Sequence, residues 1–349
     1  MKKRTLISLF LCIAICFSFL SCGTKLDQYS SHSFAYFDTV TTVTGYAKSK
    51  EEFDLVCEDI FGKLSEYHRL FTIYDRYEGL ENLCTVNEWQ DGAHRTVKVE
   101  ARIMDMLLFS KEMYRKTNGK VNIAMGSVLS IWHDYREAGL DEPQVAELPP
   151  MEKLGEAALH TDINDLILDE ENDTVMLADP AMTLDVGAIA KGYAVEMTAR
   201  SLEEKGISGY VINVGGNVRT VGTKANGEKW TAGIENPEDD GDMPYLEYLY
   251  LAGESVVTSG SYQRYYTVDG KDYHHIIDPE TLMPAENYRS VSVVCNDSGL
   301  GDALSTALFC MDFEEGLRLV ESLSDVEAMW VLTDGTKKTS SGFSVYTQK

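Results

Sequence analysis

The chain has 349 residues, of which 44% are hydrophobic and 25% are charged, and its net charge at pH 7 is −25. This length and composition are typical of a globular protein with a large core, built as one large domain or two intimate subdomains. The negative charge argues against nucleic-acid binding, which requires a basic surface.

The N-terminus has the pattern of a secretion signal. Three basic residues precede a 15-residue apolar run, which is short for a membrane span and ends just before Cys22. The segment resembles a bacterial lipoprotein signal, in which Cys22 is lipidated, although Phe19 stands where leucine is usual. We expect a signal peptide at 1–21 and a lipidated tether at 22–33, with the folded part outside the cytoplasmic membrane. The alternative is an uncleaved N-terminal anchor.

Apolar periodicity predicts the elements of the N-terminal half. Alternating β-branched residues indicate a strand over 34–47, and apolar residues at helical spacing indicate helices over 50–71 and 98–119. Segment 72–95 is irregular. Segment 133–160 contains three prolines and is interpreted as a surface excursion with a short helix.

The C-terminal half alternates between strand and helix signals. In chain order we expect a β pair over 172–187, a helix over 188–206, strands over 209–222 and 229–237, a hairpin series over 253–279, a strand over 290–295, a helix that opens at Asp302, and strands from 326 onward. Helices mixed with mainly hairpin-linked strands indicate the α+β class.

Small residues gather where a strand becomes a helix, in LDVGAIAKGYA (184–194). Such residues allow a ligand or another backbone to approach closely. Lys191 lies in the first helical turn, where it could meet an anion beside free N–H groups. Tight packing of the helix on the sheet explains the small residues equally well. The segment is not a Walker phosphate loop.

Two further glycine-containing stretches suit either a ligand or a turn. Gly215-Gly216 interrupts a strand pattern and indicates a bulge, or less often a close pass over a flat ligand. In TSGSYQRYY (258–266), hydroxyl and amide donors precede Arg264, a combination that suits a phosphate. A plain hairpin turn accounts for the first three residues as well.

HHIIDP (274–279) contains adjacent histidines. On a strand, His274 and His275 face opposite ways, so only one can point into a shared site. Histidine suits general-base work near neutral pH, whereas a purely structural histidine is the alternative.

GDALSTALFC (301–310) places Asp302 and Thr306 four residues apart at the head of an apolar helix. Asp302 could be the N-cap, accepting from amides of the first turn. Alternatively, two oxygen ligands one turn apart could hold a hard cation. These ten residues alone leave both interpretations open.

Taken together and in order, several motifs resemble those of the ApbE family, the FAD:protein FMN transferases. They are FDT, TNGKVNIAMG, LDVGAIAKGYA, YVINVGGNVRTVG, WTAGIENP, TSGSYQRYYTVDGKDYHHIIDP and DALSTAL. The resemblance covers roughly 34–340. It implies a single ApbE-like (T-fold-like) α+β domain over 34–340, made of two intimate α/β subdomains.

The resemblance implies a Mg²⁺-dependent enzyme that transfers the FMN half of FAD to a threonine hydroxyl of a partner flavoprotein, with release of AMP. Asp302 and Thr306 match side-chain metal ligands, and Ala188 matches a ligand through its backbone carbonyl. His275 aligns with the histidine of HIIDP and is our candidate for the base. The positions that match FAD contacts are Phe37, Tyr74, Lys120, Val121, Asn122, Asp185 and Lys191.

The sequence also departs from the family pattern. Asn122 stands where an acid is usual, and the loop from Tyr74 to Asn87 is longer than in many members. One alternative activity replaces threonine with water and makes the chain an FAD pyrophosphatase, a change that could turn on a pocket residue near Asn87. Another is a non-catalytic FAD-binding lipoprotein. The lipid anchor implies a membrane location on the extracytoplasmic face and an extracytoplasmic or membrane flavoprotein as acceptor.

Overall fold

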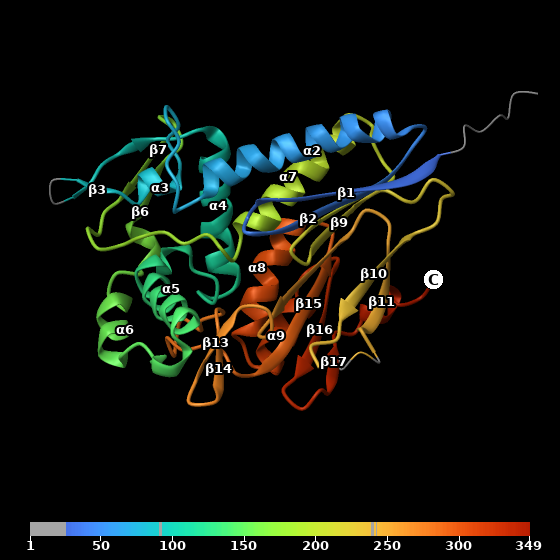
Figure 1. Cartoon of the computed structure of the whole chain (residues 1–349). Coiled ribbons are helices and arrows are strands. Elements are labelled where there is room, and N and C mark those ends of the chain that lie inside the picture. Colours follow the sequence, from blue (N-terminus) through green and yellow to red (C-terminus); the bar gives the residue numbers. More distant parts are fainter. Residues whose placement is uncertain (1–25, 91–92, 239–240, 242) are drawn as a thin grey trace, which may run out of the picture.

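An eight-stranded antiparallel sheet forms the centre of the computed structural model, which describes residues 26–90, 93–238, 241 and 243–349 (Figure 1). Its strand order is β1-β2-β8-β9-β12-β15-β16-β17. The strands are β1 Asp27–Tyr36, β2 Thr39–Ala47, β8 Tyr210–Val214, β9 Asn217–Val221, β12 Ser255–Gly260, β15 Tyr288–Cys295, β16 Val326–Leu332 and β17 Lys337–Thr339.

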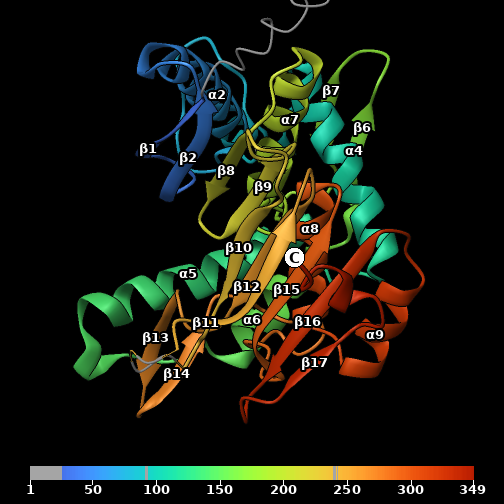
Figure 2. The same cartoon turned by 90° about the vertical axis from the view of Figure 1, so that its right-hand side faces the viewer.

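Three helices pack together against one face of this sheet, as Figures 1 and 2 show. They are α2 Lys50–Phe71, α7 Ala190–Glu204 and α8 Ser298–Phe309. The ring of Phe53 in α2 is stacked on Tyr210 in β8, with ring centroids 6.1 Å apart. The predicted helix over 50–71 is confirmed, and that over 188–206 is confirmed except for two residues at each end.

The two faces of the sheet have different partners because strand side chains alternate. Val293 and Trp330 belong to the main core under the helices, whereas their neighbours Val294 and Met329 belong to a second core. That second core lies against a hairpin formed by β10 Trp230–Glu235 and β11 Tyr245–Leu251.

The helical lobe, residues 97–182, lies beside the sheet in Figure 1. The remaining elements are α3 Leu83–Val86, β3 Trp89–Gln90, β4 Ala93–His94, β5 Val97–Lys98, α4 Ala101–Lys116, α5 Gly126–Asp141, α6 Met151–Ala158, β6 Leu166–Asp169, β7 Thr174–Leu177, β13 Tyr265–Val268, β14 Lys271–His274, α9 Phe313–Glu321, and the 3₁₀ turns Ile123–Met125, Pro143–Val145, Ile163–Asp165 and Phe343–Val345.

One continuous core joins the helical lobe to the sheet. Ile103 and Val175 from the lobe share it with Val43 and Ile212 from the sheet. A smaller cluster packs α5 against the β13–β14 hairpin through Trp132 and neighbouring residues. The sheet and the lobe therefore hold each other in place, and residues that come from both can form one rigid site.

The N-terminal part differs from the sequence prediction. Strand β1 begins at Asp27, inside the stretch expected to be the tether at 22–33. The expected single strand over 34–47 contains the end of β1, a turn and the whole of β2, because Phe37 and Asp38 have positive φ values of 54° and 50° and reverse the chain. Cys22 and the predicted signal peptide lie outside the described residues.

Two other expectations are wrong. The first part of the proposed surface excursion over 133–160, up to Asp141, belongs to the regular helix α5, which begins earlier, at Gly126. Gly215-Gly216 is not a bulge: with φ values of 54° and 83° it forms the two-residue turn between β8 and β9. In addition, the expected β pair over 172–187 contains a single strand, β7, which pairs with β5 and β6, and LDVG is an irregular segment that leads into α7.

None of the helices in the described part of the chain has the length and apolar character needed to cross a membrane.

Candidate functional site

A cavity of about 390 Å³ lies between the sheet, α8 and the helical lobe. Its lining includes every site residue predicted from the sequence within the described part of the chain: Phe37, Tyr74, Lys120, Val121, Asn122, Asp185, Ala188, Lys191, His275, Asp302 and Thr306. The structure therefore brings together residues that are up to 269 positions apart. Their individual chemical roles stay predictions.

Asp302 is an interior residue of α8, and the expectation that it opens the helix is wrong. Helix α8 begins at Ser298, and its N-cap is Asp297, whose side chain accepts from the amide of Leu300 at 2.9 Å. Asp302 is only 5% exposed. The N-cap interpretation for Asp302 on its own helix is thereby excluded.

The carboxylate of Asp302 instead faces the start of α7. Its Oδ2 accepts from the amide of Gly192 at 2.7 Å, and its Oδ1 accepts from Lys191 Nζ at 2.7 Å. Helix α7 has no side-chain cap of its own at Ile189. Asp302 therefore satisfies one of the free N–H groups of α7 and offsets the positive end of that helix.

Thr306 lies one turn after Asp302 and turns its hydroxyl to the same cavity. Its Oγ1 lies 3.5 Å from Ser259 Oγ, and Ser259 Oγ lies 2.9 Å from Ser305 Oγ. Thr306 and Ser259 thus add hydroxyl oxygens to the carboxylate of Asp302. Ala188 lines the cavity from the segment just before α7.

This donor set fits a hard cation. Among residues 26–90, 93–238, 241 and 243–349, no group of three or more His, Cys, Asp or Glu side chains is arranged to hold a metal. A cation here would have one carboxylate, a hydroxyl and a carbonyl oxygen, leaving positions for water and phosphate. Mg²⁺ takes such a mixture, whereas zinc sites use nitrogen and sulfur ligands.

His274 and His275 both line the cavity, and His275 follows the last residue of β14, so the expectation that only one of them faces the site is wrong. His274 is buried, and its pKa is lowered, mainly by burial. Its Nε2 donates to the carbonyl of Ala285 at 2.7 Å, and its Nδ1 accepts from the amide of Ile276 at 3.2 Å. Both ring nitrogens of His274 are therefore used to hold the chain around His275.

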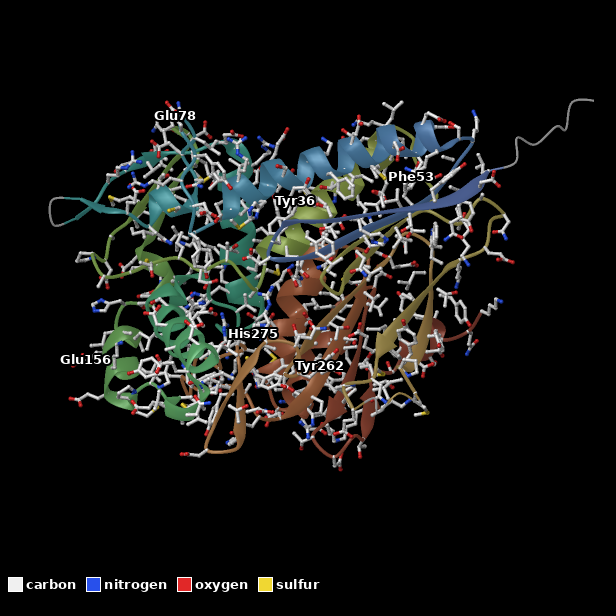
Figure 3. The ribbon with its side chains drawn as sticks, in the orientation of Figure 1. Tyr36, Phe53, Glu78, Glu156, Tyr262 and His275 are labelled. Atoms are coloured by element: carbon white, nitrogen blue, oxygen red, sulfur yellow. The ribbon has the colours of Figure 1, made fainter. Side chains whose placement is uncertain are left out.

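His275 points its ring into the open part of the cavity, and Figure 3 places it between α5 and the main sheet. Its Nδ1 donates to the carbonyl of Arg264 at 3.2 Å. The pKa of His275 is lowered to about 4, first by the loss of solvation inside the pocket and next by the charge of Arg264. The ring is consequently neutral near pH 7, with Nε2 available to accept a proton.

Positive side chains gather in the cavity although the chain as a whole is acidic. Lys191, Arg264, Arg136 and Lys120 all line it. Arg264 donates to the carbonyl of Asp38 at 3.0 Å. Lys120 is held by Asp278 and Glu280, each at 3.1 Å; burial lowers its pKa, but these two partners raise it more. Asp38, Asp185 and Asp302 line the cavity as well, so an anionic ligand would meet these cations beside carboxylates.

The other predicted polar contacts are partly occupied by the protein. Asn122 donates to the carbonyl of Thr161 at 2.9 Å and accepts from the amide of Ala124 at 2.9 Å, so it shapes its own turn. Asp185 accepts from the amide of Gly187 at 2.8 Å, and burial raises its pKa. Each residue positions backbone at the wall of the cavity.

Two aromatic rings lie at the mouth of the cavity. Phe37, in the β1–β2 turn, is half-buried with its ring edge-on to His68, 5.4 Å between centroids. Tyr74 is 62% exposed and lies 5.8 Å from the ring of His133. An exposed ring beside the cavity offers a stacking surface for a planar heterocycle.

Comparisons with known proteins agree with this geometry. A model of the ApbE family matches residues 37–330. The chain is 33% identical to the FAD:protein FMN transferase of Klebsiella pneumoniae over 273 residues, which make up 75% of this chain and 81% of that protein. It is 32% identical to the FAD:protein FMN transferase of Treponema pallidum over 254 residues, 69% of this chain and 67% of that protein. This chain belongs to the ApbE family.

Solved ApbE structures have the same fold. The ApbE protein from Thermotoga maritima matches with a TM-score of 0.79 at 26% identity, over 93% of this chain and 100% of that one. The flavin transferase ApbE from Vibrio cholerae matches with a TM-score of 0.76 at 22% identity, over 92% and 100%. The predicted ApbE-like α+β fold is confirmed, and the curated relatives confirm the predicted enzyme class.

Sequence reasoning missed part of this ApbE pocket. His133 and Arg136 enter it from α5, a segment interpreted as a surface excursion. Asn87 is not among the lining residues; its side chain accepts from the amide of Leu184 at 2.7 Å and donates to the carbonyl of Leu184 at 2.9 Å. It therefore acts on the pocket through the backbone next to Asp185.

Proposed function

We propose that this ApbE protein transfers FMN from FAD to a threonine hydroxyl of a partner flavoprotein and releases AMP. The observation that carries the proposal is the convergence of three features on one cavity. A neutral histidine, His275, lies in the same pocket as cationic side chains and the oxygen pair of Asp302 and Thr306. A carrier protein would need the cations and the aromatic rings, but not a histidine prepared to accept a proton.

In the proposed step, the threonine oxygen of the acceptor forms a bond to the FMN phosphorus. The bond from that phosphorus to the bridging oxygen breaks, and AMP leaves with the electron pair. The hydroxyl proton passes to Nε2 of His275, which is unprotonated because Nδ1 holds the ring proton. Lys191 and Arg264 lie in the same pocket, and their positive charges would stabilise the negative charge of the phosphates during the transfer.

Asp302, Thr306 and the carbonyl of Ala188 would hold Mg²⁺. When bound, Mg²⁺ would neutralise the pyrophosphate and stabilise the charge of phosphoryl transfer. Phe37 and Tyr74 would contact the isoalloxazine ring from the mouth of the pocket. Lys120, Val121, Asn122 and Asp185 would complete the FAD contacts along the wall, chiefly by shaping the backbone there.

We also propose that the enzyme is a lipoprotein anchored through Cys22 on the extracytoplasmic face of the membrane. Its acceptor would then be an extracytoplasmic or membrane flavoprotein with an exposed threonine motif. The lipoprotein-like signal at 1–22 is the support for this location.

The test is a mass spectrum of the acceptor. The full chain in detergent is incubated with FAD, Mg²⁺ and a flavoprotein fragment that carries the threonine motif. We expect the fragment to gain about 438 Da, the mass of one FMN less water, with an equal amount of AMP. Free FMN and AMP without a labelled fragment would instead identify a pyrophosphatase. Bound FAD with neither product would identify a flavin carrier.

A further inference from the structure

The ion pair between Lys191 and Asp302 joins a residue with a predicted FAD contact to a residue with a predicted metal contact. Nζ of Lys191 lies 2.7 Å from Oδ1 of Asp302, and both side chains are largely removed from solvent, with 23% and 7% of their surfaces exposed. A cation already occupies one oxygen of the carboxylate that would hold the metal. The ammonium of Lys191 and a divalent cation would therefore compete for Oδ1 of Asp302.

The second oxygen of Asp302 is fixed independently of Lys191. Oδ2 accepts from the backbone amide of Gly192 at 2.7 Å. Gly192 fits there only because it lacks a side chain, since a Cβ would overlap Asp302 Cβ and the carbonyl oxygen of Ser298. The carboxylate would consequently keep its place when Lys191 leaves, because the close packing of α7 against α8 holds it.

Lys191 is also able to move without unfolding the site. Its stem begins in the first turn of α7, at the edge of the cavity, and the cavity extends from Asp302 to Arg264 and His275. A lysine at the N-terminal end of a helix is unfavourable next to the positive end of the helix dipole. Asp302 offsets that cost in the metal-free protein, and an anionic ligand in the cavity could offset it afterwards.

We propose that Lys191 is the internal counter-ion of Asp302 in the metal-free enzyme, and that a divalent cation displaces its ammonium into the cavity. The same event would fill the metal site and present a positive charge to the substrate phosphate. Metal binding and preparation for FAD are then coupled through one side chain. This inference rests on the metal site of the proposed function.

The first test measures cation affinity without FAD or acceptor, and so does not depend on transfer activity. Mn²⁺ is titrated into the full chain in detergent, and free Mn²⁺ is followed by electron paramagnetic resonance. Lys191→Met removes the competitor and should tighten Mn²⁺ binding about tenfold or more. Arg264→Gln removes another pocket cation that does not contact Asp302, and should change the affinity less than about threefold.

The two variants and Asp302→Asn separate the possible failures. If Mn²⁺ affinity increases equally in Lys191→Met and Arg264→Gln, or in neither variant, Lys191 does not compete with the cation for Asp302, and the proposal is overturned. Asp302→Asn should abolish the binding; if it binds like the wild type, the cation lies elsewhere and the proposed metal site fails. Should Lys191→Met fold poorly, Lys191→Gln provides the same removal of charge with a polar side chain.

The second test follows the displaced ammonium in the wild-type chain. Amines are acetylated briefly with and without Mg²⁺, and each lysine is quantified by peptide mass spectrometry. We expect Lys191 to be labelled at least about threefold faster with Mg²⁺, because a released amine is no longer held in an ion pair. Lys205, which is paired with Asp59 at 2.6 Å outside the cavity, is the control and should not change. Unchanged or slower labelling of Lys191 would overturn the displacement, whatever the transfer assay gives.

Discussion

Nδ1 of His275 donates a hydrogen bond to the backbone carbonyl of Arg264, at 3.2 Å. A carbonyl oxygen can only accept, so the contact assigns the ring proton to Nδ1 and leaves the lone pair on Nε2. The guanidinium of Arg264 lines the same cavity and opposes protonation of the ring. Arg264 therefore sets the tautomer of His275 through its backbone, and its side chain adds to the loss of solvation that keeps the ring neutral.

Replacing this histidine tests its role as base. We expect His275→Gln to retain FAD binding and to lower kcat for transfer by about 10²- to 10⁴-fold, the usual contribution of a positioned general base. Flavin fluorescence titration gives the affinity, and the acceptor mass spectrum gives the rate. A variant that loses FAD affinity while keeping its kcat would make His275 a binding residue.

The pH dependence follows from the same site. Because the pKa of His275 is lowered to about 4 in the folded protein, kcat/KM should stay level through neutral pH and fall only near pH 4. The unfolded chain takes up the proton first as the pH falls, since its histidine has an ordinary pKa near 6.5. The imidazole of His275 thus makes its full contribution to the free energy of unfolding above about pH 6.5. This contribution is lost as the pH falls from about 6.5 to 4.

Urea unfolding at pH 7 and pH 4.5 checks the sign of this effect. The wild type should lose more stability over this interval than His275→Gln, which has no imidazole to titrate. Parallel losses in the two proteins would contradict the lowered pKa.

The oxygen pair of α8 is tested by matched changes at Thr306. Thr306→Ser keeps a hydroxyl on the cavity side, whereas Thr306→Val keeps the shape and removes the oxygen. We expect the valine variant to need a Mg²⁺ concentration about tenfold higher or more for half-maximal transfer, and the serine variant to stay near the wild type. Asp302→Ala should abolish Mg²⁺-dependent turnover. An unchanged rate in Asp302→Ala would remove the metal assignment.

Much of the fold was predictable where one physical signal dominates. Helix α2 has a clear apolar stripe and a Ser49 cap, and its predicted limits are the observed ones. Helix α5 was missed in part because prolines follow it, and their presence led us to interpret the whole segment 133–160 as irregular. The β1–β2 turn was missed because Phe37 and Asp38 adopt positive φ, which the alternating β-branched pattern does not reveal.

The site was predictable as a set of residues but not as a set of contacts. Motif resemblance named Lys191 and Asp302 separately, whereas their ion pair spans 111 positions and depends on how α7 meets α8. The start of α8 was placed at Asp302 because the true cap, Asp297, precedes a small-residue stretch with little helical signal. Local sequence cannot show which of Asp297 and Asp302 caps α8, since both have side chains that can cap a helix. Only the packing of the folded protein buries Asp302 and leaves Asp297 as the cap.

The close approach of α7 and α8 predicts a strong effect at Gly192. Gly192→Ala should destabilise the fold by about 1–3 kcal/mol, because the new methyl group would overlap Asp302 and Ser298. Gly62→Ala is the matched control in α2, where no atom lies within 4 Å, and it should gain up to about 1 kcal/mol. Thermal unfolding of both variants measures the contrast. A Gly192→Ala protein as stable as Gly62→Ala would mean that α7 and α8 are not in this tight contact.

Asn87 offers a test of a residue that acts on the pocket without lining it. Its amide group makes two hydrogen bonds to the backbone of Leu184, which directly precedes Asp185 in the cavity wall. Asn87→Ala leaves both backbone groups of Leu184 without these partners and should cost about 1–3 kcal/mol of stability. KM for FAD should rise more than kcat falls, since the wall loosens while His275 and Asp302 stay in place. Asn164→Ala is the control, because Asn164 is exposed and its amide group donates to nearby Asp162 at 2.9 Å. If the two variants share the same KM and stability, Leu184 is held by the rest of the core, and the pocket wall does not depend on Asn87.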